Sequence, residues 1–129
     1  MFYTDNEGYV GARADGPTQS LALWLVDDVG TSLTTALNLL ADLADIAAGR
    51  KSTEEWDGSA WAATLDRDKV SVRNLFRPAL HGTYPFDQVR QVADDYWRFL
   101  VSDGSRDKVE ALTEWEEWNG HPHPRHAEL

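Results

Sequence analysis

The side chains of this chain that could do chemistry are its four histidines and its many carboxylates, because the sequence contains no cysteine. Histidine is a common general acid or base near neutral pH. His81 falls in a predicted loop, whereas His121, His123 and His126 lie in a short C-terminal segment with two prolines. None of them is predicted on an ordered element, where a nucleophile–base pair would need its base.

Motifs that mark active sites are missing as well. The sequence has no G-x-S-x-G, H-E-x-x-H, P-loop or G-x-G-x-x-G pattern. Carboxylates are so frequent that a pair of them carries no information. We therefore predict no enzymatic activity, no catalytic residue, no metal site and no cofactor. A small hydrolase or nuclease that uses His81 and nearby carboxylates is the alternative, although a net charge of −10 disfavours nuclease action without a metal.

The acidic residues are unevenly distributed along the chain. Residues 1–49 carry seven acids and one base, residues 50–101 carry eight of each, and residues 102–129 carry seven acids and three bases. A negative field repels nucleic acid and anionic membranes, and it speeds the encounter with basic proteins. The charge therefore predicts a basic protein partner and disfavours nucleic acid and membranes.

Several acidic residues stand where such a partner could bind them. Glu54, Glu55 and Asp57 surround Trp56 in a polar connection over residues 50–58, and tryptophan is a favoured anchor residue in interfaces. The simpler interpretation is that Trp56 folds down as a lid on the core. The candidate contact residues are Glu54, Glu55, Trp56 and Asp57, Asp42 and Asp45 on one predicted helix, and Asp94 and Asp95 on another.

The elements that must position these residues follow from the spacing of apolar residues. Alternation over residues 61–72, with a charged turn at 66–69, predicts a β-hairpin. Apolar residues three and four apart predict helices over residues 30–49 and 86–101. A shorter helix over residues 106–118, capped by Ser105, would turn its inner line of Val109, Leu112 and Trp115 to the core.

The N-terminal part is predicted to form another hairpin, from residues 8–14 and the apolar run Leu21–Val26. Asp28 or Thr31 would cap the helix that follows. The predicted fold is α+β: a four-stranded, mainly antiparallel sheet made of two hairpins, a long helix between the hairpins, and two C-terminal helices. Residues 1–120 would form a single domain, and residues 121–129 a flexible tail.

The order of these features resembles the YacL-like group of small bacterial proteins, and immunity proteins of contact-dependent growth inhibition systems show a related layout. The resembling pieces are VGTSLTTALNLLADLADIAAGR, EEWDGSAWAATLDRDKVSVRNL and FDQVRQVADDYWRFLVSD, which together cover a little over half of the chain. They repeat an order of helix, link with tryptophan, strand, charged turn, V-x-V strand and helix. The C-terminal helix and the histidine-containing tail depart from the compact version of that group.

The resemblance implies a protein without catalytic residues that binds and neutralises a cognate toxin domain, often a nuclease, by blocking its active site. An acidic inhibitor suits the basic substrate groove of a nuclease. A housekeeping assembly factor with an unrelated protein partner is the alternative, which genome neighbourhood would separate. We expect a cytoplasmic location, because the first residues lack a signal peptide and the apolar runs are too short to span a bilayer.

Overall fold

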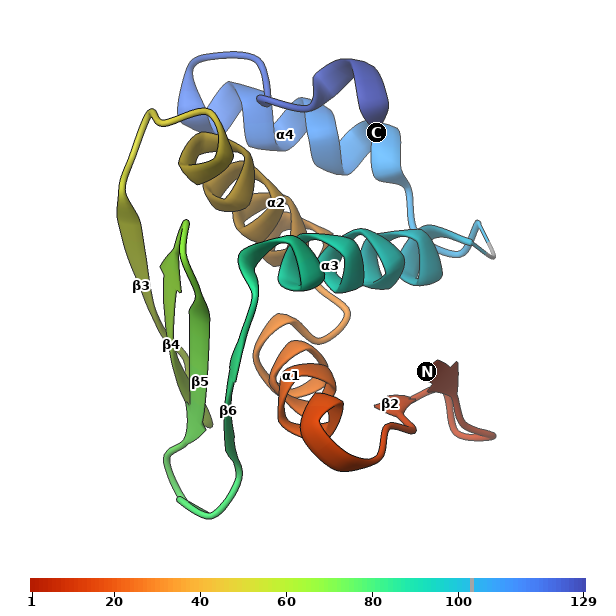
Figure 1. The fold of residues 1–129 in the computed structure, drawn as a ribbon. Helices are drawn as coiled ribbons and strands as arrows, with labels where there is room; N and C mark the ends of the chain where they lie inside the picture. The colour runs from red at the N-terminus through yellow and green to blue at the C-terminus, as the bar shows by residue number, and fades with distance from the viewer. Residues whose placement is uncertain (103) are drawn as a thin grey trace.

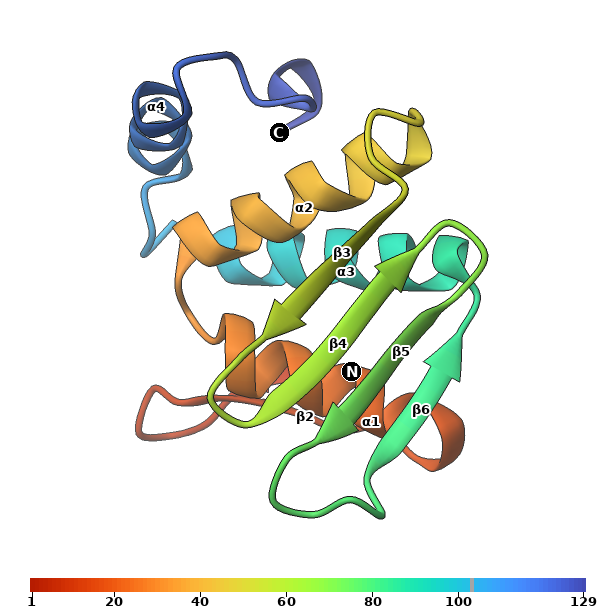
Figure 2. The same cartoon turned by 90° about the vertical axis from the view of Figure 1, so that its left-hand side faces the viewer.

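The computed structural model describes residues 1–102 and 104–129 and has the predicted α+β class. A four-stranded antiparallel sheet in the order β3-β4-β5-β6 forms one layer, and helices cover one of its faces (Figures 1 and 2). The elements are β1 (Phe2–Thr4), β2 (Val10–Ala12), η1 (Gly16–Thr18), α1 (Gln19–Trp24), η2 (Leu25–Val29), α2 (Leu33–Ala47), β3 (Thr53–Asp57), β4 (Trp61–Asp66), β5 (Val70–Asn74), β6 (His81–Tyr84), α3 (Phe86–Val101), α4 (Lys108–Asn119) and η3 (His126–Glu128).

The central hairpin of β4 and β5 is confirmed. Leu65 pairs with Val70 across a turn that begins at Asp66, where the amide of Asp66 donates to the carbonyl of Lys69. Every second side chain of the two strands is buried, which is the alternation of a sheet covered on one face. Trp61 and Leu65 are completely buried on that face.

Both outer strands of the sheet were predicted as irregular segments. The connection over residues 50–58 contains the edge strand β3, and the loop over residues 79–85 contains the edge strand β6. Neither segment has a run of alternating apolar residues, so only pairing with β4 and β5 reveals them as strands. Polar edge strands are common because charged side chains there discourage pairing with other chains.

The apolar run Leu21–Val26 was predicted as a strand and is helical, so the expected first hairpin is wrong in its second strand. Leu21, Leu25 and Val29 lie four residues apart and are buried, a spacing that fits a helix packed between the sheet and the N-terminal hairpin. A short apolar run does not distinguish a buried strand from a buried helix. The N-terminal hairpin that does form joins β1 to β2 and lies outside the main sheet.

Helix α2 is confirmed within the predicted range, but its cap differs. Ser32 caps it by accepting from the amide of Thr35 at 3.1 Å. Asp28 instead accepts from the amides of Ala60 and Trp61, both at 3.2 Å, and so ties η2 to the start of β4. The helix ends at Ala47, and Gly49 beyond it has a positive φ of 78°, a conformation that glycine adopts readily after the end of a helix.

Helix α3 spans the predicted residues and packs on α2. The hydroxyl of Tyr96 on its inner face donates to the carbonyl of Gly30 at 2.6 Å, and burial raises its pKa to about 12. From β6, the hydroxyl of Tyr84 donates to Pro17 at 2.6 Å. These two tyrosines fasten α3 and the sheet to the segment that contains α1.

Helix α4 forms as predicted, with a different inner line. Trp115 and Ala111 are buried, whereas Val109 is 68% exposed, so its predicted inward orientation is wrong. Asp107 rather than Ser105 caps the helix, accepting from the amide of Glu110. Within the described residues, no helix is both long and apolar enough to cross a membrane.

The last residues were predicted as a flexible tail and instead pack on the domain. His123 is 2% exposed, and its ring lies against Trp115. Its Nε2 lies 2.9 Å from the carbonyl of Leu37 on α2, and its Nδ1 accepts from the amide of Arg125 at 3.0 Å. The prolines exclude regular helix there, but they do not prevent a segment from being anchored by one buried ring.

Candidate functional site

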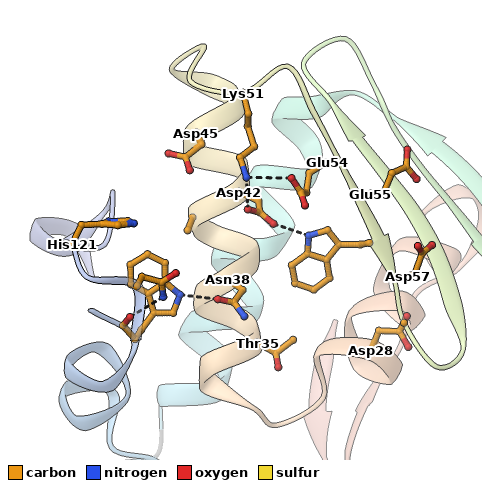
Figure 3. Close-up of a pocket in the computed structure, with 15 residues that line it drawn as sticks. Asp28, Thr35, Asn38, Asp42, Asp45, Lys51, Glu54, Glu55, Asp57 and His121 are labelled. Carbon is orange, nitrogen blue, oxygen red and sulfur yellow. Dashed lines mark hydrogen bonds and ion pairs between the residues drawn. The ribbon is translucent and has the colours of Figure 1, made fainter. Parts of the chain in front are cut away.

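A groove of about 580 Å³ lies between β3, α2 and the C-terminal part of the chain. Figure 3 shows α2 as its floor, with Thr35, Asn38, Asp42 and Asp45 along the helix and His121 on the opposite side from β3. We call this hollow the acidic groove. Its carboxylates are Asp28, Asp42, Asp45, Glu54, Glu55 and Asp57, and its one Lys or Arg side chain is Lys51.

Six of the eight residues predicted to contact a partner meet at this groove. They are Asp42 and Asp45 on α2 and Glu54, Glu55, Trp56 and Asp57 on β3. Residues from a helix and from the following strand come together because the short link between α2 and β3 folds the strand back beside the helix (Figure 2). Glu54 and Trp56 turn their side chains toward α2, whereas Glu55 and Asp57 alternate with them along β3 and border the groove from the outer face of the sheet.

The other two predicted residues lie away from the acidic groove, on α3. Asp94 forms an ion pair with Arg125 of the C-terminal segment, and Arg125 is largely buried there. Asp95 pairs with Arg98 on its own helix and accepts from Gln91 at 3.0 Å. Asp94 therefore helps to anchor the C-terminal segment, and neither residue belongs to the groove.

A charged network holds the β3 side of the acidic groove in place. Lys51 Nζ lies 3.0 Å from Asp42 Oδ1 and 3.2 Å from Glu54 Oε2, and Trp56 Nε1 donates to Asp42 Oδ2 at 2.8 Å (Figure 3). Burial opposes the charged form of Lys51, but the hydrogen bonds that Lys51 donates to the two carboxylates outweigh it and raise its pKa. Lys51 thus neutralises only part of the charge that surrounds it.

Two tryptophans form apolar parts of the groove wall. The Trp56 ring meets the buried Trp24 edge-on at 6.2 Å, which fixes its orientation. Trp115 on α4 donates from Nε1 to Asn38 Oδ1 at 2.8 Å, and His121 packs edge-on against its ring. Aromatic faces beside carboxylates form a surface that suits a guanidinium or ammonium group.

At the far end of the groove, the Asp28 carboxylate lies beside Gly58. Burial raises its pKa, although hydrogen bonds from the amides of Ala60 and Trp61 act in the opposite direction. A side chain at position 58 would overlap this carboxylate, so the absence of a Cβ in Gly58 allows the close approach of η2 and β3. Asp28 therefore has a structural role in addition to its negative charge.

Several groove residues escaped prediction. Lys51, Trp115, Asn119 and His121 come from elements whose position beside β3 is a tertiary feature. Asn38 was identifiable in principle, because it lies on the polar face of α2, four residues before Asp42. That shared helical face is a signal in the sequence that groups Asn38, Asp42 and Asp45.

The alternative catalytic residue, His81, lies on the opposite edge of the sheet from β3. It is exposed on β6, opposite Arg73 in the register. Strands are spaced about 4.8 Å apart, so two intervening strands separate it from Asp57, its counterpart in the register on β3, by about 14 Å. Within residues 1–102 and 104–129, no hydrogen bond or ion pair joins the His81 ring to a carboxylate, and no group of histidines and carboxylates is placed to hold a metal ion.

Comparisons with protein-family models, with curated proteins and with solved structures find no match to this chain. The acidic groove therefore has to be interpreted from its own geometry. It combines six carboxylates, one lysine and two tryptophans, and it is open to solvent rather than enclosed. Such a surface is suited to binding basic side chains of another macromolecule.

Proposed function

We propose that this protein is an immunity protein, which binds a cognate bacterial toxin domain and neutralises it by covering its active site. The observation that carries the proposal is the acidic groove, because six predicted residues line it, with Glu55 and Asp57 at its rim. The toxin would be a basic domain, such as a nuclease with a positively charged substrate groove. The expected mode of inhibition is occlusion, without catalysis by this chain.

The charge distribution around the groove supports a positively charged partner. Lys51 pairs with two of the six groove acids, Asp42 and Glu54, and Arg50 pairs with Asp45. Within the described residues, the other three groove acids form no ion pair. Complementary charge raises association rates and discriminates against acidic surfaces. We therefore expect fast association with the toxin domain that weakens as salt concentration rises.

Co-expression tests the proposal directly. The gene immediately upstream would be expressed alone and together with this chain, and growth and nucleic-acid integrity would be followed. Neutralisation of a toxic neighbour by this chain, with recovery of a complex of the two, is the expected result. If the neighbours encode no toxic domain that this chain neutralises, the immunity function is wrong.

Matched variants connect neutralisation with the groove. Asp45→Asn combined with Glu54→Gln removes two groove charges, whereas Glu114→Gln combined with Glu117→Gln removes two exposed charges of α4 outside it. Both pairs change the net charge equally. Only the groove pair should weaken binding, by about tenfold or more, which corresponds to about 1.4 kcal/mol.

A further inference from the structure

Strand β3 is the edge strand of the main sheet on the side of the acidic groove, and its outer backbone edge pairs with no other strand of the described chain (Figure 2). The Gly58 amide donates to the Trp61 carbonyl at 2.9 Å, which makes these two residues a hydrogen-bonded pair. Such pairs alternate along an antiparallel ladder, so Trp56 and Glu54 also turn their backbone groups to β4. The N–H and C=O groups of Thr53, Glu55 and Asp57 therefore point away from the sheet.

Side-chain contacts support this assignment. Side chains of opposed residues approach closely where a pair lacks backbone hydrogen bonds. The pair Glu55 and Thr64 shows such an approach, with Thr64 Oγ1 at 3.2 Å from Glu55 Oε2. Thr53, Glu55 and Asp57 are exposed, and in the described part of the chain no hydrogen bond to their backbone N–H or C=O groups comes from outside the ladder.

The position of this edge determines where an added strand would lie. A strand paired with β3 would run about 4.8 Å from it, over the acidic groove. Alternate side chains would then enter the groove beside Asp42, Asp45 and Glu54, while the others would lie beside Glu55 and Asp57 on the opposite face. An added strand would therefore meet carboxylates on both of its faces.

We propose that β3 is a docking edge that pairs with an extended basic segment of the partner protein, which continues the sheet to a fifth strand over the acidic groove. Backbone hydrogen bonds to Thr53, Glu55 and Asp57 supply binding, and lysine or arginine side chains opposite the carboxylates supply specificity. The identity of the partner rests on the proposed immunity function, whereas the mode of binding does not.

The negative charge of β3 disfavours pairing of this edge with a second copy of the same chain. A second copy of this chain would place its own Glu54, Glu55 and Asp57 against the same residues, and like charges across strands destabilise pairing. The other edge of the sheet, β6, has no charged residue in its strand His81–Tyr84. The β3 edge is therefore selective for a basic strand, while the β6 edge offers no matching charge.

Synthetic peptides test the backbone component without knowledge of the toxin. The probe is an eight-residue peptide of alternating arginine and threonine. Two controls have the same sequence, with N-methyl groups on the arginine amides in one and on the threonine amides in the other. Because only one set of amides can face β3, one methylated peptide should bind like the parent and the other should lose at least tenfold in affinity.

Amide hydrogen exchange of the protein locates the contact. Binding of the parent peptide should slow exchange at Thr53, Glu55 and Asp57 at least tenfold. Glu55→Pro removes one outward N–H without disturbing the β4 ladder and should weaken binding more than Glu55→Ala, which removes only the charge. Failure of the peptide to bind, equal binding of all three peptides, or protection elsewhere would overturn the proposal.

The two proposals fail separately in these experiments. A toxin complex in which the amides of Thr53, Glu55 and Asp57 remain unprotected would preserve the immunity function and refute strand addition. Selective binding of the basic peptide with protection of these amides, without any neutralised toxin, would support strand addition and leave the immunity function refuted.

Discussion

Replacing His123 with alanine should destabilise the protein strongly, although this residue lies only six positions from the last residue. The substitution removes the hydrogen bond to Leu37 and the one from the Arg125 amide. Each is worth about 1 kcal/mol. It also removes the ring contact with Trp115 at 4.5 Å, worth about 1 kcal/mol, and leaves a cavity. We expect the free energy of unfolding to fall by about 3 kcal/mol.

Urea denaturation followed by tryptophan fluorescence measures this change, and His126→Ala is the matched control. The His126 side chain is 59% exposed and contacts Glu116 at the surface, where an ion pair contributes about 1 kcal/mol or less. A loss below about 0.5 kcal/mol for His123→Ala, or equal losses for both variants, would refute the anchoring role of His123.

The remaining predictions concern pH, one hydroxyl and one glycine. Burial lowers the pKa of His123 below its ordinary 6.5, so as pH falls the unfolded chain binds a proton before the folded chain does. The free energy of unfolding should therefore decrease as pH drops below about 6.5. The urea midpoints at pH 7.5 and pH 5.5 should differ less for His123→Ala than for the parent. Tyr84→Phe loses hydrogen bonds to Pro17 and from the Leu21 amide and should cost about 1–3 kcal/mol in thermal unfolding, whereas the exposed Tyr9→Phe should cost almost nothing. Gly58→Ala should destabilise the protein by overlap with the Asp28 carboxylate, and a calorimetric unfolding temperature equal to that of the parent would contradict this.

Local sequence patterns explain which elements were predictable. Helix α3 combines an apolar stripe at helical spacing with Pro85 directly before it, and its predicted and observed limits coincide. The hairpin of β4 and β5 combines alternation with a charged turn. In both elements, local propensity and burial favour the same structure, so neighbouring residues suffice for the prediction.

Tertiary contacts explain the elements that the sequence did not reveal. Strands β3 and β6 are polar edges that exist through pairing with β4 and β5. The run Leu21–Val26 is buried except for the half-buried Leu23 and Val26, because its helix packs between the sheet and the N-terminal hairpin, so it shows no polar helical face. His123 is buried through partners on α2 and α4 that lie far away in the sequence. No local pattern indicates such contacts.

The candidate site was predicted in composition rather than in arrangement. Charge and the isolated Trp56 pointed to six groove residues, but Asp94 looked equivalent to Asp42 in the sequence. The difference between them is the ion pair of Asp94 with Arg125, formed by a segment expected to be flexible. Lys51 likewise became part of the site only through its two contacts with Asp42 and Glu54.

Calorimetric titration of this protein with the purified toxin domain from the neighbouring gene tests the central claim most directly. We predict saturable one-to-one binding that weakens with salt, is reduced about tenfold or more by Asp45→Asn with Glu54→Gln, and is unchanged by Glu114→Gln with Glu117→Gln. Absence of binding, or equal binding by the two double variants, would contradict the account of the acidic groove as the site that captures a basic toxin.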